Sequence, residues 1–366
     1  MPASGIGPCY DPGHGAIPIT ETVVRVFLGL AWVFAGPLLV PGLAQTSWVR
    51  QEVPITDGLH GVFFADENHG WAFTYGTGTV LATRDGGRQW RVVHRFPGFE
   101  NGFYFEQIQF KNPQTGWICG EGYVFRTGDG GESWQEISPN VPGRIRIPKK
   151  DNGGTRRVLY YAMHFFADGT GLVSGMKLPQ EEGKERTPLL FSTNDRGDRW
   201  REVPQAPAMF LSFSFPGGET GYAGGREGIW ATSDLGETWR KVFSDESRPK
   251  VGQIRSIHCR DERILWACGF GGVVLHSSDA GATWGRVDVT PNRLRGMLFV
   301  DAQRGFLCGD RNKEPSVLFS TRDAGRSWQP FPLESPDLHR LFATSKRLWA
   351  VGKEGTLLSL SLDEAQ

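Results

Sequence analysis

Six carboxylates recur in one short pattern, Thr/Ser-x-Asp-x-Gly-x-x-Trp, and are the first residues to consider for chemistry. Two carboxylates that face one substrate can act as general acid and general base, as in glycoside hydrolysis. This pattern favours another role, because a turn Asp accepts hydrogen bonds from backbone N–H groups and the following Gly supplies a positive φ. We therefore predict structural turns and no catalytic residue. The six aspartates are Asp85, Asp129, Asp195, Asp234, Asp279 and Asp323.

A second set of polar side chains follows the start of seven short apolar segments, such as LHGVFF and IRSIHC. The alternating apolar positions of these segments indicate half-buried strands. We expect their second residues to surround the mouth of a central channel, and Arg340 to lie beside the last of them. Charges there must be solvated or paired, so the set either lines a water-filled channel or binds a partner. The set is His60, Glu106, Tyr161, Leu211, Arg255, Arg295 and His339.

Basic residues are concentrated in one long insertion near residues 138–158, whose only acid is Asp151. Its arginines are Arg144, Arg146, Arg156 and Arg157, and its lysines are Lys149 and Lys150. On the same face we place Arg248, Lys250, Arg293, Arg311 and Lys313. Such a face suits an acidic partner, although a solvated loop is the alternative. The aromatic segment Phe96–Phe105 either anchors an interface beside it or packs over a sheet edge.

The elements that must position these residues follow from the repeat. Its tryptophans are spaced by 44, 66, 39, 45 and 44 residues, which is close to the period of a four-stranded propeller blade. We predict an all-β, seven-bladed β-propeller of four-stranded antiparallel blades, with the Asp turns on the face opposite the functional loops. The last blade lacks an Asp turn, and the segment Thr46–Val53 should supply its outer strand. Closing the ring in this way removes an exposed sheet edge.

The N-terminal segment predicts export. An apolar run, Val26–Val40, follows Arg25, and Gly42 and Ala44 suit a cleavage site before Gln45. We expect residues 1–44 to be a signal peptide and 45–366 to be the propeller, located in the periplasm or outside the cell. A membrane anchor is the alternative. Residues before Val23 lack a basic segment, so translation is expected to begin near there.

Charge and cysteine content exclude several classes of function. The net charge is zero, which gives no overall attraction to nucleic acid. Cys119, Cys268 and Cys308 share one repeat position and, with Cys259, are expected in the core. A Cys259–Cys268 disulfide is the alternative. No metal-ligand spacing occurs, so we expect neither a metal nor a cofactor.

The Asp turns together with the Gly-Trp strands, as in HGWAF…GTVLATRDGGRQW and TGWICGEGYVFRTGDGGESW, resemble a known family. The resemblance is to the photosystem II stability and assembly factors of cyanobacteria and plastids, and it covers about residues 46–366. It implies a non-enzymatic exported propeller that binds a photosystem precursor protein through an arginine-bearing face, and a thylakoid-lumen location if the host is photosynthetic. By position, that role would fall to Arg255, Arg295 and Arg340. The long insertion, the loop Lys177–Pro188 and the missing lipid-anchor Cys depart from the family.

Three functions remain to be distinguished. The first is a non-catalytic scaffold or assembly factor, a monomer whose partner is a client protein, either a membrane-protein assembly intermediate or another exported protein. The second is an exported glycoside hydrolase of the sialidase type, suggested by Arg146-Ile147-Pro148. That motif follows the second Asp turn instead of preceding the first, and no Tyr occurs after Tyr222. The third is a receptor domain that binds carbohydrate or peptide.

Overall fold

The structure is a computed structural model that describes residues 48–99, 103–141, 158–179, 185–204, 206–244, 253–311, 314–331, 333 and 338–363. The chain divides into Met1–Gln45 and Thr46–Gln366, and only the second unit contains described residues. The predicted signal peptide and most of the predicted insertion lie outside them. Within the described ranges, no helix is long and apolar enough to cross a membrane.

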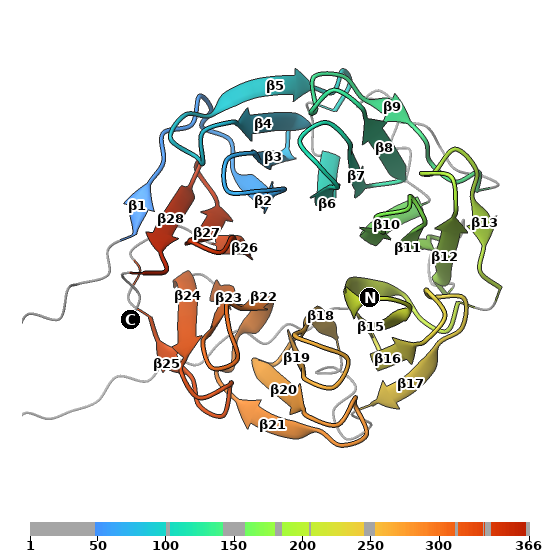
Figure 1. Cartoon of the computed structure of the whole chain (residues 1–366), viewed down its shortest axis with the longest axis vertical. Helices are drawn as coiled ribbons and strands as arrows, with labels where there is room; N and C mark the ends of the chain where they lie inside the picture. Colours follow the sequence, from blue (N-terminus) through green and yellow to red (C-terminus); the bar gives the residue numbers. More distant parts are fainter. Residues whose placement is uncertain are drawn as a thin grey trace, which may run out of the picture. The chain divides into compact units, whose positions relative to one another are not determined.

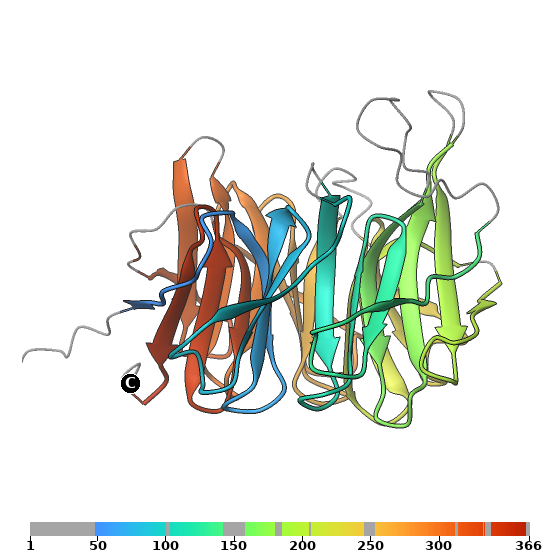
Figure 2. The same ribbon diagram turned by 90° about the horizontal axis from the view of Figure 1, so that it is seen from above.

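The described residues form antiparallel sheets only, and Figure 1 shows these sheets arranged around a common centre. Seen from above, the sheets stand side by side (Figure 2). Four sheets have four strands in sequence order. They comprise β10 (Val158–Phe165), β11 (Gly171–Lys177), β12 (Thr187–Thr193) and β13 (Arg201–Glu202); β14 (Phe210–Gly217), β15 (Thr220–Gly225), β16 (Gly228–Thr232) and β17 (Arg240–Phe243); β18 (Ile254–Cys259), β19 (Leu265–Gly269), β20 (Val273–Ser277) and β21 (Gly285–Asp288); and β22 (Arg293–Phe299), β23 (Gly305–Arg311), β24 (Glu314–Thr321) and β25 (Gln329–Pro330).

Two further sheets contain the first and last strands. One sheet has the order β1-β28-β27-β26, and in it Val49 of β1 lies opposite Ser359 of β28. The other has eight strands and consists of two four-stranded sheets, β2–β5 and β6–β9, which are linked where Tyr75 and Gly76 at the end of β3 pair with Tyr104 and Phe103 of β6. The first of these sheets comprises β1 (Val49–Arg50), β26 (Leu338–Ala343), β27 (Arg347–Gly352) and β28 (Leu357–Ser361). The second comprises β2 (Leu59–Phe64), β3 (Gly70–Gly76), β4 (Thr79–Thr83), β5 (Arg91–Arg95), β6 (Phe103–Phe110), β7 (Gly116–Gly120), β8 (Tyr123–Thr127) and β9 (Gln135–Glu136).

Each Asp turn is held by a short local network of hydrogen bonds. In the first copy, the Thr83 hydroxyl donates to Asp85 Oδ1 at 2.8 Å and accepts from the Gly87 N–H at 2.9 Å. Two adjacent residues of the turn have positive φ. In the first two copies both are glycines, whereas in the other four Arg196, Leu235, Ala280 and Ala324 occupy the first of the two places. The sequence pattern indicated the need for Gly only at the second place.

Neighbouring sheets are joined by the Trp of the Gly-Trp strand. Trp71 of β3 stacks on Phe110 of β6 with ring centroids 3.5 Å apart, and its indole N–H donates to the Gly130 carbonyl at 2.8 Å. Trp349 of β27 stacks on Phe64 of β2 at 4.5 Å, so the last sheet contacts the first. Similar stacking joins Trp117 with Phe165 and Trp266 with Phe299.

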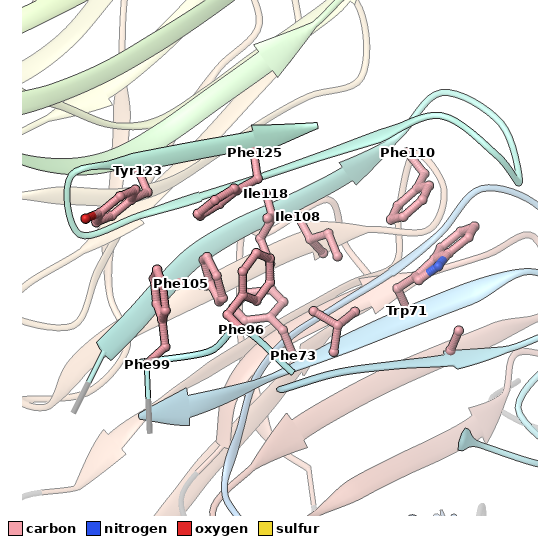
Figure 3. Packing of buried hydrophobic residues seen from close by; sticks show 12 residues of the cluster. Trp71, Phe73, Phe96, Phe99, Phe105, Ile108, Phe110, Ile118, Tyr123 and Phe125 are labelled. Atoms are coloured by element: carbon pink, nitrogen blue, oxygen red, sulfur yellow. The ribbon is translucent and has the colours of Figure 1, made fainter. Parts of the chain in front are cut away.

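The four cysteines predicted in the core are buried, and Phe96, Phe99 and Phe105 of the aromatic segment pack within the protein. Cys119, Cys259, Cys268 and Cys308 are free and buried. The alternative Cys259–Cys268 disulfide is wrong, because Ser256 lies opposite Cys268 and Leu265 lies opposite Cys259. Phe96 and Phe99 pack with Phe105 and Phe125 between two sheets (Figure 3), so they are core residues and not exposed anchors.

Candidate functional site

The inner strands β2, β6, β10, β14, β18, β22 and β26 enclose a cavity of about 350 Å³. Its described lining carries three guanidinium groups and one carboxylate. These are Arg255, Arg295, Arg340 and Glu106. The three arginines that the sequence analysis singled out therefore meet at one place, although they come from three different strands.

These side chains converge because each inner strand has a β-bulge at an equivalent position near its start. The register of pairing with the next strand shifts around this position, so the residue there has no partner in the ladder. A bulge of this kind redirects the side chain of the extra residue. The bulge residues that line the cavity are Glu106, Tyr161, Leu211, Arg255 and Arg295. Arg340 stands one place later and pairs normally with Val351.

The two predicted histidines lie elsewhere. His60 and His339 are also bulge residues, but they are buried against each other with ring centroids 5.3 Å apart and are not part of the cavity lining. Tyr75 covers them, with its ring 5.2 Å from His60 and 5.8 Å from His339. Tyr75 could not be predicted from the sequence, because its place above the histidines depends on the extension of β3 toward β6.

Glu106 is the electrostatic centre of the site. Its Oε2 lies 3.6 Å from Nη2 of Arg340 and 3.6 Å from Nε2 of His60. Burial raises the pKa of Glu106, but contact with His60 and the charges of His60, Arg340 and Arg255 outweigh burial and leave the pKa lowered. The carboxylate is therefore ionised at neutral pH. Burial lowers the pKa of His60, against the opposing effect of Glu106.

Aromatic rings border the arginines. The guanidinium groups of Arg255 and Arg293 lie 6.0 and 5.4 Å from the centroid of the Phe270 ring. Distances of this size allow an attraction between the cation and the ring face. Tyr75 is 45% exposed and is the large aromatic side chain that the described surface exposes most. The cavity lining itself combines the guanidinium groups with the aromatic residues Phe63, Phe73, Tyr161, Phe213 and Phe342.

Polar side chains of some inner strands form hydrogen bonds with the backbone of the next inner strand. This linking role was not predicted from the sequence. The Gln109 side chain of β6 accepts from the Phe165 N–H of β10 and donates to the Phe165 carbonyl, both at 2.9 Å. Ser212 and Ser214 of β14 accept from backbone N–H groups of β18. The signal in the sequence is a polar residue one or three places after the bulge residue of the inner strand.

The remaining predicted residues lie apart from the cavity or outside the described ranges. The six aspartates of the turns are not among the cavity-lining residues. Hydrogen bonds from the Thr283 hydroxyl and N–H and from the Ser277 hydroxyl lower the pKa of Asp279 to about 2. Most of the predicted basic face lies outside the described residues, including the predicted partner-binding residues Arg144, Arg146, Arg156 and Arg157. The same holds for Lys149, Lys150, Arg248, Lys250 and Lys313. In the described part of the chain, no group of three or more His, Cys, Asp or Glu residues could hold a metal ion.

Comparison of the sequence with known proteins finds photosystem II assembly factors. A family model described as "Photosynthesis system II assembly factor YCF48" matches residues 40–149. Photosystem II assembly protein Ycf48 of Thermosynechococcus vestitus is 26% identical over 331 residues, covering 77% of this chain and 88% of that protein. The chloroplastic photosystem II stability/assembly factor HCF136 of Arabidopsis thaliana is 24% identical over 350 residues, covering 86% of this chain and 79% of that protein.

The fold agrees with these relatives. A solved structure of YCF48 bound to D1 peptide superimposes with a TM-score of 0.60 at 21% identity, covering 86% of this chain and 97% of that one. The predicted propeller fold and the predicted resemblance to photosystem II assembly factors are confirmed.

Proposed function

We propose that this assembly factor-like propeller is a non-catalytic scaffold that binds an acidic segment of a client protein at the cavity containing Arg255, Arg295 and Arg340. The observation that carries the proposal is the convergence of these three cations on a lining whose only described carboxylate is Glu106. Guanidinium groups pair with carboxylates through strong, charge-assisted hydrogen bonds. Clustered cations also speed the approach of an acidic partner.

The relatives support a protein client. They are named as a photosystem II assembly protein and a photosystem II stability/assembly factor, and a YCF48 has been solved bound to a D1 peptide. By analogy, the client of this chain is a membrane-protein assembly intermediate or another exported protein. Residues 1–44 act as the signal peptide, and the exported propeller works as a monomer in the periplasm, outside the cell, or in the thylakoid lumen of a photosynthetic host.

The architecture proposed for the binding protein is a ring of seven blades. Pairing of β1 with β28 supports closure of the ring by the N-terminal strand. Contact of Trp349 with Phe64 supports the same closure. The Asp turns act as structural connections in this ring, because each carboxylate bonds within its own turn.

Catalysis is the less favoured function. The usual glycoside hydrolase mechanism needs two carboxylates that flank one bond. Glu106 is paired with Arg340 and His60, and its lowered pKa suits an ion-pair partner better than a general acid. The cavity therefore favours binding of an anion over hydrolysis.

A pull-down from the native host tests the proposal. The triple variant Arg255→Glu, Arg295→Glu and Arg340→Glu should lose the client that the wild-type protein recovers. A matched control, Arg88→Glu with Arg199→Glu and Arg326→Glu, makes the same change in net charge at exposed residues of the Asp turns. The control should keep the client. Unchanged recovery by the cavity variant, with both variants folded by circular dichroism, would refute the proposed function.

A further inference from the structure

Glu106 is an unusual residue for a site that binds anions. It stands at the bulge of β6, its side chain is only 17% exposed, and it is the one described carboxylate in the cavity lining. A buried carboxylate is costly unless it is paired. Here one of its partners, Arg340, is a cation that the acidic ligand would use.

The contact of Glu106 with Arg340 is close enough for their charges to attract each other, but it is not a tight hydrogen bond. The Oε2 atom of Glu106 lies 3.6 Å from Nη2 of Arg340 and 3.6 Å from Nε2 of His60. A charge-assisted hydrogen bond measures about 2.7–2.9 Å. Arg340 also donates to the Arg295 carbonyl at 3.4 Å, which is a long contact, and its side chain remains 25% exposed. A ligand carboxylate could therefore approach Arg340 without breaking a short bidentate pair.

We propose that Glu106 is an internal counter-ion that pairs with Arg340 in the free protein and competes with the carboxylates of an acidic peptide for this arginine. This inference rests on the proposed function and adds a specificity residue to it. A ligand with one carboxylate merely exchanges one ion pair for another. A ligand with two or more carboxylates can engage Arg255 and Arg295 as well, so Glu106 selects for clustered acids.

The alternative role for Glu106 is purely structural. Three guanidinium groups in one cavity repel one another, and burial together with the charge of Arg340 lowers the pKa of Arg255. A carboxylate among them would stabilise the fold without affecting ligand affinity. Loss of the Glu106 charge should therefore raise ligand affinity if Glu106 competes with the ligand, and leave affinity unchanged if its role is structural.

The test measures binding of a tetramethylrhodamine-labelled hexaglutamate peptide with an amidated C-terminus, by fluorescence anisotropy with the full chain at low salt. Glu106→Gln removes the charge and keeps the size of the side chain. It should bind the peptide about tenfold more tightly than the wild type, because a like charge close to the ligand has been removed. This gain should shrink in 0.5 M NaCl, since salt screens charges that water reaches.

Two controls separate charge from other effects. Glu106→Asp keeps the charge and should not gain affinity. Glu202→Gln makes the same change in net charge on the exposed outer strand β13 and should bind as the wild type does. A thermal melt of each variant reports any loss of folded protein.

The outcomes distinguish this inference from the function on which it rests. Equal or weaker binding by folded Glu106→Gln, while the triple arginine variant loses the peptide, overturns the competitor role and leaves the proposed function standing. Equal binding by the wild type and the triple arginine variant overturns both. Tighter binding by Glu106→Asp would also overturn the inference, because the charge would then not be the cause.

Discussion

Two histidines of the inner strands should make stability depend on pH. His164 of β10 lies between the rings of Phe166 and Phe215, with centroids 4.6 and 4.8 Å away. His258 of β18 lies near Trp266 and Phe299. Burial lowers the pKa of each to about 4, from 6.5 in an exposed peptide. Both side chains are therefore neutral in the folded protein at pH 5, whereas they are charged in the unfolded chain.

The sign and size of the effect follow from proton linkage. Since the unfolded chain binds more protons, protonation favours unfolding as the pH falls from 6.5 toward 4. With these pKa values, His164 alone should lower the free energy of unfolding by about 2 kcal/mol between pH 7.5 and pH 5. The stability is present above pH 6.5 and is lost below it.

Urea unfolding of the His164→Gln variant at pH 7.5 and pH 5 measures this contribution. The variant should lose about 2 kcal/mol less stability than the wild type over this interval, whatever its stability at pH 7.5. The double variant with His258→Gln should lose about 4 kcal/mol less, since the two rings have different neighbours. Phe166→Leu is the matched control, because it loosens the same packing and carries no titratable group. A pH dependence in His164→Gln equal to that of the wild type would refute the reasoning.

Two further predictions concern packing and are read from urea unfolding at pH 7.5. Gly120→Ala should lower the free energy of unfolding by about 2 kcal/mol or more, because a Cβ there would stand 2.1 Å from the Tyr104 carbonyl oxygen. Gly128→Ala, where a Cβ meets nothing within 4 Å, should change it by less than about 0.5 kcal/mol, and equal effects of the two would contradict the packing argument. Trp71→Phe should cost about 1–2 kcal/mol, since it keeps an aromatic ring over Phe110 but removes the buried hydrogen bond to the Gly130 carbonyl. A loss indistinguishable from zero would show that this bond does not stabilise the junction between the two sheets.

The features that the sequence predicted well are local ones. The Asp turns could be recognised because their bonds join residues only two or four places apart, as from Thr83 to Asp85 and Gly87. The inner strands could be located because their apolar residues alternate. The bulges could not be predicted as backbone features, yet the repeat placed Arg255 and Arg295 in equivalent positions, and the structure brings both to one cavity.

The misplaced residues depended on distant parts of the chain. His60 and His339 occupy the same repeat position as the arginines, but they are buried because Tyr75 reaches over them. Phe96 and Phe99 looked equally suited to an interface or to a core. They are buried because they pack against the rings of Phe105 and Phe125, which belong to the next sheet.

The sequence by itself determined the repeat, the Asp turns, the inner strands and the propeller fold, because each of these rests on short-range hydrogen bonds or on the period of apolar residues. It also supplied the resemblance to photosystem II assembly factors. Only the tertiary structure decided that Glu106 lies beside Arg340 and His60, which come from strands at opposite ends of the chain. Charge pairing depends on distances across the cavity, and no pattern within one strand encodes those distances.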